Sequence, residues 1–365
     1  MAAFLPKDLV QRLQKQKFAT TLLAWYKANN RQLPWRLDYR RLASPYPVLV
    51  SEIMLQQTVI EAVLPAYDRF MQRFPELIDL AEATPDEVRQ TCRGLGYYRR
   101  FGFLHATAKA ITEAKSWPTD FASWRALPGI GEYTASALSS IVNQVPVMVV
   151  DGNVERVFCR LLDLQIPANT PALKRELQKI GPSLVDPKHP GDFNQALMEL
   201  GQLICRPVSP ACEQCPVSQA CLAKARSSQK LAPQPKLKVA FKSVNLRILL
   251  EGNANGFNLE GRPPSAKFLA GISGFKTLIQ QKNGQWLVDG GSDTFKIGDR
   301  DWQSVGHFRH AITNHKLSVQ VFVHRHLYKS INKKLAFDAT ELNRQLVASL
   351  DQKALNLLMK EVVIV

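Results

Sequence analysis

Between residues 18 and 221, apolar side chains recur every three or four residues, the spacing that places them on one face of an α-helix. This pattern is found at residues 18–26, 48–70, 103–111, 133–141, 154–164 and 193–204. Prolines fall between most of these segments, as expected where helices end and loops begin. The first part of the chain is therefore predicted to be all-α.

The pattern changes in the last third of the chain. Short runs of β-type sequence, bounded by glycine and asparagine, predict strands at residues 244–250, 257–259, 286–288 and 317–323. Between the two patterns lies a stretch with six lysines and arginines, two prolines and no acidic residue, which is typical of a basic linker. We predict an all-α region over 1–223, a linker over 224–242 and a smaller α+β domain over 243–365.

The charge balance points to a polyanionic partner. The 365 residues include 47 Lys and Arg against 31 Asp and Glu, a net charge of +16, which favours nucleic acid as the first candidate. No apolar stretch approaches the roughly 20 residues that span a bilayer, and the first residues lack a secretory apolar core. We expect a soluble, cytoplasmic, nucleoid-associated protein with no membrane partner.

Four of the six cysteines, Cys205, Cys212, Cys215 and Cys221, are close together in the sequence. Six cysteines are too few for a disulfide scaffold in a chain of this length, whereas converging thiolates bind soft metals. The segment holds no second Cys-x-x-Cys pair and no histidine, so the usual zinc-ribbon pattern is absent. A 4Fe–4S cluster is the preferred prediction; zinc or unliganded thiols are the alternatives.

The sequence Leu127-Pro128-Gly129-Ile130-Gly131 interrupts two helical patterns. Glycines let a backbone approach a phosphate closely, and the helix that follows presents unpaired N–H groups. The segment therefore fits a DNA-backbone contact, although a simple tight turn between helices explains it equally well. A dinucleotide-binding loop is disfavoured, because there is no third glycine and no preceding strand.

These motifs occur together in an order that is similar to one known family. The matching segments are residues 33–36, 51–58, 94–98, 127–131, 151–154 and the four cysteines. In this order they resemble the adenine DNA glycosylases of the MutY family, strongly over residues 18–221 and more weakly beyond. The resemblance implies a six-helix barrel beside an iron–sulfur module, and a nudix-like C-terminal domain. No nudix box is visible, so that domain is interpreted as a recognition module.

The resemblance also implies an activity. Family members excise adenine mispaired with 8-oxoguanine or guanine from double-stranded DNA, and we expect this chain to do so as a monomer, leaving an abasic site. A thymine or uracil mismatch glycosylase is one alternative. A noncatalytic DNA-binding protein with a structural metal is another.

Two carboxylates fit this chemistry. Glu52 has apolar neighbours in the sequence, a setting that raises a carboxyl pKa and suits a general acid. By resemblance, it would protonate adenine N7. Asp151 precedes a predicted helix, so an N-cap role explains it from sequence alone. In the family, this position stabilises the oxocarbenium ion or attacks C1′ transiently.

The resemblance adds supporting residues around this pair. Tyr133 and Asn153 match positions that hydrogen-bond around the carboxylates, and Glu199 and Arg36 match positions behind them. Strand-cleaving relatives carry a lysine where this chain has Tyr133. We therefore expect a monofunctional enzyme that forms no Schiff base.

DNA contacts are also implied by the resemblance. Gln57 and Tyr97 would wedge into the base stack beside the flipped adenine. Taken alone, Gln57 fits a polar helix face and Tyr97 fits a core contact. Leu127, Gly129 and Gly131 would meet the DNA backbone.

In the C-terminal domain the family reads 8-oxoguanine with a Phe-Ser-His segment. Without gaps, Ile312, Thr313 and Asn314 replace it here, and His315 substitutes for the histidine only with a shift of one residue. Thr313 keeps a hydroxyl and Asn314 keeps a donor and an acceptor. Ordinary surface or core roles are the alternative for the histidine.

Overall fold

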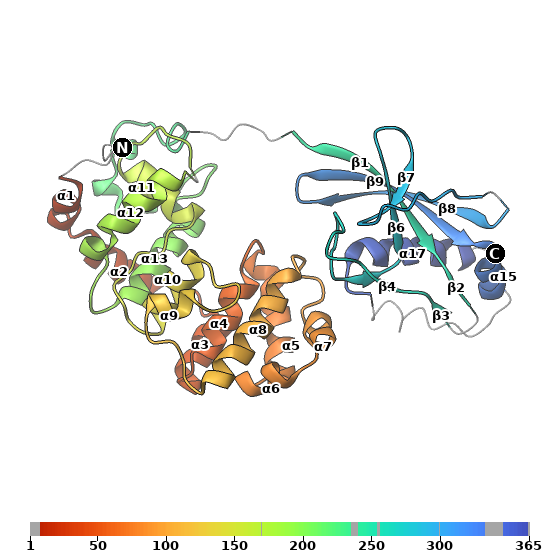
Figure 1. Cartoon of the computed structure of the whole chain (residues 1–365). Coiled ribbons are helices and arrows are strands. Elements are labelled where there is room, and N and C mark those ends of the chain that lie inside the picture. Colours follow the sequence, from red (N-terminus) through yellow and green to blue (C-terminus); the bar gives the residue numbers. More distant parts are fainter. Residues whose placement is uncertain are drawn as a thin grey trace. The chain divides into compact units, whose positions relative to one another are not determined.

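The computed structural model describes residues 8–168, 170–234, 240–253, 256–298, 300–332 and 346–363. It divides into two compact units, residues 1–83 with 103–237, and residues 84–102 with 238–365. Helices make up the first unit, and the sheet lies in the second (Figure 1). The coarse prediction of a helical N-terminal region and a smaller sheet-containing C-terminal region is therefore confirmed. The predicted boundaries at 223 and 242 stay a prediction.

The first unit is built from short helices. They are α1 (Leu9–Lys15), α2 (Phe18–Asn29), α3 (Pro34–Leu42), α4 (Tyr46–Met54), α5 (Ile60–Arg73), α6 (Leu77–Glu82), most of α8 (Arg99–Ala114), α9 (Phe121–Arg125), α10 (Glu132–Ile141), α11 (Gly152–Leu161), α12 (Pro171–Leu184), α13 (Pro190–Glu199) and α14 (Leu222–Ala225). A π-helical turn, Leu200–Ile204, follows α13, and 3-10 turns lie at Cys212–Gln214 and Ser218–Ala220. Among the described residues, no helix is long and apolar enough to cross a bilayer.

Local sequence explains where these helices begin. Pro34, Pro171 and Pro190 occupy the first helical position of α3, α12 and α13, where a missing N–H costs nothing. One predicted segment is wrong: residues 48–70 do not form one helix, because the chain leaves the helical conformation between Met54 and Ile60. Within that break, Gln57 adopts a left-handed φ of 56°.

An aromatic cluster fixes the helices that carry the later part of the site. Phe18 of α2 packs against Phe158 of α11 and Phe193 of α13, with ring centroids 6.3 and 6.1 Å apart. All three side chains are fully buried, and each stabilises the fold by about 1.5–3 kcal/mol. These contacts pack α2 against both α11 and α13.

The second unit contains α7 (Pro85–Thr91) and a five-stranded sheet. Its strands are β1 (Lys242–Leu250), β6 (Lys276–Gln280), β7 (Trp286–Val288), β8 (Trp302–Ile312) and β9 (His315–His324), in the order β7-β6-β1-β9-β8. The pair β1 and β9 is parallel, and the other pairs are antiparallel. Short two-residue strands are β2 (Gly252–Asn253), β3 (Gly256–Phe257), β4 (Glu260–Gly261) and β5 (Ser273–Gly274).

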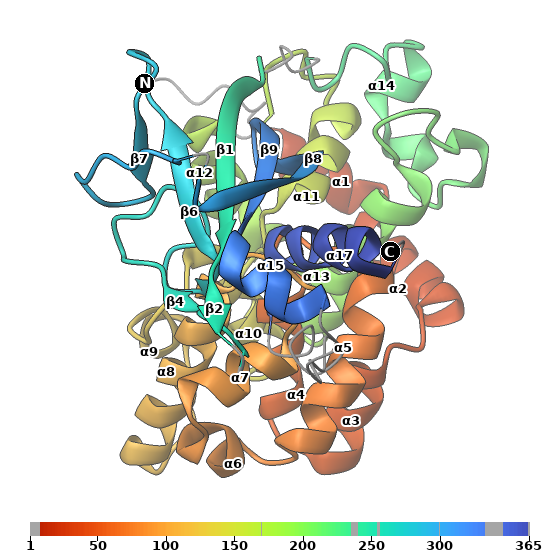
Figure 2. The same cartoon turned by 90° about the vertical axis from the view of Figure 1, so that its right-hand side faces the viewer.

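One face of this sheet is covered. The helix α17 (Ser349–Val363) lies across that face, and α15 (Arg325–Asn332) follows β9 (Figures 1 and 2). Leu246, Val319 and Leu355 belong to the core between sheet and helix, so side chains alternate between inside and outside along β1 and β9. Strands β8 and β9 form a hairpin in which Ile312 pairs with His315, which leaves two residues at its tip.

Candidate active site

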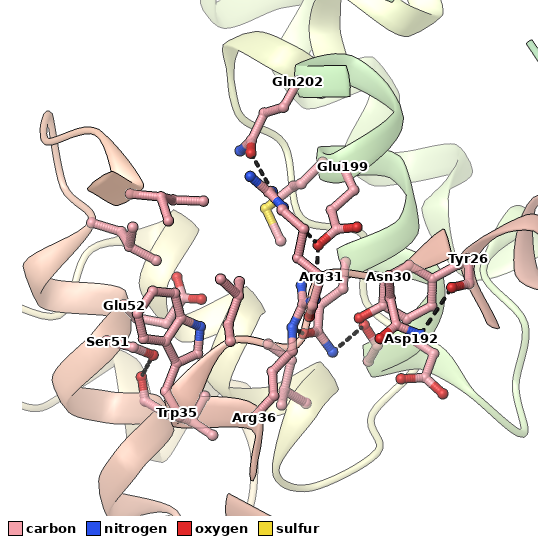
Figure 3. Close-up of a pocket in the computed structure, with 18 of the residues that line it drawn as sticks. Tyr26, Asn30, Arg31, Trp35, Arg36, Ser51, Glu52, Asp192, Glu199 and Gln202 are labelled. Atoms are coloured by element: carbon pink, nitrogen blue, oxygen red, sulfur yellow. Dashed lines mark hydrogen bonds and ion pairs between the residues drawn. The ribbon is translucent and has the colours of Figure 1, made fainter. Parts of the chain in front are cut away.

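The first unit contains a cavity of about 1030 Å³. Seven residues predicted from the sequence line it: Arg36, Glu52, Gln57, Tyr133, Asp151, Asn153 and Glu199. They come from α3, α4, α10, α13, the start of α11 and the break after α4. Figure 3 shows Glu52 on one side of this cavity and Glu199 on the other. The structure therefore brings together all six predicted catalytic residues.

Glu52 lies on α4, a helix whose residues are all buried, and is itself only 7% exposed. Burial raises the pKa of Glu52 from 4.5 to about 7. The negative charge of Asp151 adds to this rise, whereas a hydrogen bond from Tyr133 and the positive charge of Arg36 oppose it. Its Oε2 has no hydrogen-bond partner among the described residues. A carboxyl group with this pKa can donate a proton near neutral pH.

Tyr133 is the second residue of α10, directly after the turn at Gly131. Burial and the nearby Glu52 and Asp151 carboxylates raise its pKa well above 10, so the hydroxyl keeps its proton. That hydroxyl is close enough to Glu52 to lower the carboxyl pKa by hydrogen bonding, and it also lies 3.4 Å from Met198 Sδ. The Tyr133 hydroxyl is therefore a neutral hydrogen-bond donor placed between Glu52 and Met198.

Asp151 is the N-cap of α11. Its Oδ1 accepts hydrogen bonds from the backbone N–H groups of Asn153 (2.9 Å) and Val154 (2.7 Å). Its Oδ2 accepts a third from the Asn153 amide at 2.7 Å. Asp151 is therefore an N-cap, as its sequence context predicted. Because the same hydrogen bonds orient its carboxylate at the cavity, the cap role is compatible with a role in catalysis.

Asn153 is held in turn by a residue that the sequence did not single out. Arg156 donates from Nη2 to Asn153 Oδ1 (2.9 Å) and to the carbonyl of Gly201 (2.7 Å). Its Nε donates to the carbonyl of Cys205 at 2.8 Å. The signal that could have found it is the spacing of three residues from Asn153, which places both side chains on one helix face.

On the opposite side, Glu199 binds two guanidinium groups. Its Oε1 is 2.7 Å from Arg36 Nη1 and 3.3 Å from Arg31 Nε (Figure 3). Arg36 Nε also donates to Gln195 Oε1 at 2.7 Å, and Arg31 donates to Gln202. The sequence predicted Glu199 and Arg36 but missed Arg31 and the two glutamines. Gln195 precedes Glu199 by one helical turn, which was the available signal.

Glu199 Oε2 is buried and has no partner within the part of the chain that the structure describes. Together with Glu52 Oε2, it gives the cavity two unsatisfied carboxylate oxygens. Buried polar atoms are normally hydrogen-bonded, so such atoms suit a polar ligand with donors of its own.

The predicted hairpin is a tight turn outside this cavity. Gly129 has φ +70°, and a Cβ on it would lie 2.3 Å from Phe103 Cβ, so the position requires glycine. Gly131 is the N-cap of α10, and Leu127 precedes the turn. The geometry explains the glycines, while a DNA contact for Leu127, Gly129 and Gly131 stays a prediction.

Gln57 and Tyr97 differ from their simplest sequence interpretations. Gln57 lies in the break after α4 and lines the cavity, so it is not on a helix face. Tyr97 is 48% exposed with φ 47°, so it is not a core residue, whereas its neighbour Tyr98 is buried. Both side chains are exposed, and their contacts with DNA stay a prediction.

The four cysteines line one small cavity of about 30 Å³. No set of three or more His, Cys, Asp or Glu side chains in the described ranges is grouped so that it could hold a metal ion. Four cysteine side chains around one cavity are a donor set that fits a soft-metal cofactor, and the 4Fe–4S cluster stays a prediction.

The predicted lesion-reading residues lie at the end of the β8–β9 hairpin. Thr313 and Asn314 form its tip, and Thr313 is exposed with φ 52°. His315 is set back, with its ring perpendicular to Phe268 and the centroids 5.4 Å apart. The residues of the ungapped alignment, Thr313 and Asn314, therefore lie at the tip of the hairpin. The alignment shifted by one residue uses His315, which packs against Phe268 instead.

The comparisons with known proteins agree with this geometry. Residues 50–183 match the family described as HhH-GPD superfamily base excision DNA repair protein. A human adenine DNA glycosylase is 42% identical over 222 residues, which are 58% of this chain and 40% of that protein. The adenine DNA glycosylase of Buchnera aphidicola subsp. Acyrthosiphon pisum (strain APS) is 31% identical over 251 residues, 68% of this chain and 71% of that protein. This chain belongs to the adenine DNA glycosylase family.

Membership of the adenine DNA glycosylase family confirms the resemblance drawn from the ordered motifs. The chain spans about two fifths of several relatives: 40% of the human, 39% of the Arabidopsis thaliana and 42% of the Mus musculus protein. Among solved structures, a thermostable thymine-DNA glycosylase matches with a TM-score of 0.52 at 25% identity, covering 59% of this chain and 99% of that one. Over that 59% of its length, this family member thus shares its fold with the thymine-DNA glycosylase.

Proposed function

We propose that this chain is a monofunctional DNA N-glycosylase that flips adenine out of double-stranded DNA and excises it. The adenine would be mispaired with 8-oxoguanine or guanine, the enzyme would act as a monomer, and the product would be an abasic site. The observation that carries this proposal is Glu52, a buried carboxyl with a pKa of about 7, in one cavity with Tyr133 and Asp151. Paired carboxylates with different environments are what acid-assisted glycosidic cleavage requires.

The reaction needs a proton donor and a negative charge. Protonated Glu52 donates to N7 of adenine while the N-glycosidic bond breaks, and the bonding electrons leave with the base. The Asp151 carboxylate stabilises the positive charge that develops at C1′, or bonds to it transiently. Water then adds to C1′, and Glu52 accepts its proton. Tyr133 and Asn153 orient the two carboxylates throughout.

The opposite side of the cavity would position the base. Glu199 is fixed by Arg36 and Arg31, and its free Oε2 can accept a hydrogen bond from an exocyclic amino group. Adenine carries such a group, and thymine and uracil do not. This arrangement supports adenine over thymine and uracil.

Several finer features remain part of the proposal. The helices of the first unit would form a six-helix barrel and an iron–sulfur module, and the second unit would be a nudix-like recognition domain joined by the linker 224–242. Gln57, Tyr97 and the hairpin at Gly129 and Gly131 would contact DNA, and Thr313 and Asn314 would read the opposing base. Nucleoid association would follow from DNA binding.

Cys205, Cys212, Cys215 and Cys221 would hold a 4Fe–4S cluster, which supplies a rigid cross-link for the loop between them. Protein purified without oxygen should then be brown and contain about four irons per chain. Colourless protein with one equivalent of zinc would contradict this assignment.

A thymine or uracil mismatch glycosylase is the second candidate, favoured by the fold shared with the thymine-DNA glycosylase structure. One single-turnover excision assay separates the two. We expect cleavage of A opposite 8-oxoguanine and A opposite G, and none of T or U opposite G. Borohydride should trap no covalent DNA adduct, because Tyr133 has no amine to form a Schiff base. Removal of T or U with A left intact would reverse the assignment.

A further inference from the structure

Arg160, on the last turn of α11, is only 4% exposed although it carries a full positive charge. Its Nη1 lies 3.3 Å from Cys205 Sγ. The guanidinium also donates to four main-chain carbonyls, those of Arg206 (2.7 Å), Pro207 (3.1 Å), Ala232 (3.0 Å) and Gln229 (3.2 Å). This residue therefore joins α11 to the segments on both sides of the cysteine loop.

The same residue touches a second cysteine through its backbone. Cys221 Sγ lies 3.3 Å from the carbonyl oxygen of Arg160. The first and the last of the four cysteines thus both lie against one residue of α11. Since Gln229 and Ala232 follow the last cysteine, the guanidinium also anchors the chain that leaves the loop.

Burying a guanidinium is costly unless a negative group compensates its charge. Carbonyl oxygens satisfy its N–H groups but carry no net charge, and Cys205 sulfur is the remaining acceptor in this set. As a metal-bound thiolate, that sulfur belongs to an anionic centre. The position of Arg160 is thus explained when the four cysteines are ligands rather than free thiols.

We propose that Arg160 is a positioning residue for the cofactor site: it donates to the Cys205 thiolate, offsets its charge and holds the loop ends in place. This inference rests on the proposed 4Fe–4S cofactor. It assigns to Arg160 two measurable properties of the cluster, its retention and its reduction potential. Hydrogen bonds and positive charge at a ligand sulfur raise the potential, because they stabilise the more negative, reduced state.

Two substitutions separate charge from geometry. Arg160→Gln removes the charge and most of the donors. Arg160→Lys keeps the charge, but the three donors of its ammonium group cannot reproduce the planar arrangement of the five guanidinium donors. The matched control is Arg206→Gln in the cysteine loop, since the exposed Arg206 side chain donates to the carbonyl of Ser209 at 3.0 Å.

Full-length proteins purified anaerobically are compared by iron content, by the rate at which EDTA bleaches the absorption near 400 nm, and by film voltammetry. In the last measurement, the electrode supplies or accepts one electron. We expect Arg160→Gln to lose iron about 10- to 100-fold faster than the parent and to show a lower midpoint potential. Arg160→Lys should be intermediate, and Arg206→Gln should match the parent.

Equal bleaching rates and equal potentials in the parent, Arg160→Gln and Arg160→Lys, with four irons in each, would overturn the inference and leave the cofactor assignment intact. If Arg160→Gln fails to fold, this lysine comparison decides alone. Zinc or no metal in the parent protein would instead overturn the cofactor assignment together with the inference. A lower midpoint potential in Arg160→Gln, with all four irons retained, would support the electrostatic role of Arg160 directly.

Discussion

The cavity in the helical unit and the tip of the β8–β9 hairpin are built in opposite ways. In the cavity, Glu52 and Glu199 are buried, and Asp151 accepts three hydrogen bonds. At the tip, Thr313 is exposed, and its hydroxyl contacts its neighbours Ile312 (2.7 Å) and Asn314 (3.4 Å). One region is held by many distant parts of the chain, the other by a two-residue turn.

This difference matches what each region is proposed to do. Moving a carboxyl pKa towards 7 requires burial, and burial requires helices from several parts of the chain to pack around the group. Reading a base needs only exposed donors and acceptors, each worth about 1–3 kcal/mol. Changes in the cavity should therefore remove activity, whereas changes at the tip should alter preference.

The largest effect is expected at the general acid. Glu52→Gln keeps the size and polarity of the side chain but removes the transferable proton. We expect single-turnover excision to fall by about 10²- to 10⁴-fold, with duplex binding retained. Glu113→Gln, at an exposed position of α8, is the control and should excise at the parent rate.

The same substitution has a distinct stability signature. Because the folded-state pKa of Glu52 is raised, the stability that its protonated form contributes is present below 4.5 and is lost as pH rises through about 7. Above pH 7, Glu52→Gln should thus be more stable than the parent, by up to about 3 kcal/mol. Excision at the parent rate by a stable Glu52→Gln protein would remove Glu52 from the mechanism.

Asp151→Asn tests whether the N-cap also acts in catalysis. Asparagine still caps a helix, so unfolding free energy should change by less than about 1 kcal/mol. Loss of the negative charge at C1′ should lower excision by about 10²- to 10³-fold. Asp120→Asn is the matched control, because Asp120 caps α9 by accepting from Ser123 N–H at 2.8 Å, outside the cavity. A stability loss without loss of excision would leave Asp151 with the cap role alone.

The two regions also differ in how far sequence could predict them. The motifs containing Glu52, Tyr133 and Asp151 named the residues that the structure brings into one cavity. Sequence missed Arg31, Gln195 and Arg156, because each acts on a partner whose position depends on tertiary packing. It also joined α4 and α5 into one helix, since apolar spacing continues across residues 55–59 although the backbone turns there.

At the β8–β9 hairpin, a different part of the structure escaped prediction from the sequence. Alternating residues predicted β1 and β9 correctly, but sequence alone left open which residues stand at the tip. The pairing of Ile312 with His315 assigns Thr313 and Asn314 to it. The residues at the tip depend on the pairing register of β8 with β9, and a single sequence does not specify which residues pair.

An effect of intermediate magnitude is expected from pH, which should change the excision rate set in the cavity but not the base preference set at the hairpin tip. Since the protonated form of Glu52 is the active one, the single-turnover rate should be level well below pH 7 and fall about tenfold per unit above it. Ionic strength must be held constant, because DNA binding is salt-dependent. The preference for 8-oxoguanine over guanine should stay constant across the same range. A rate that rises above pH 7 would contradict Glu52 as the acid.

The smallest effect is expected at the tip. Replacing both Thr313 and Asn314 with Ala removes the exposed donors and acceptors, so the preference for A opposite 8-oxoguanine over A opposite G should fall roughly tenfold, equal to about 1.4 kcal/mol. Slow excision opposite guanine should be nearly unchanged, because the carboxylates belong to the other unit. Asn283→Ala, in the turn between β6 and β7, is the matched control and should keep the full preference. If His315→Ala loses the preference and the double variant keeps it, the alignment shifted by one residue is correct. If neither variant changes it, discrimination lies elsewhere.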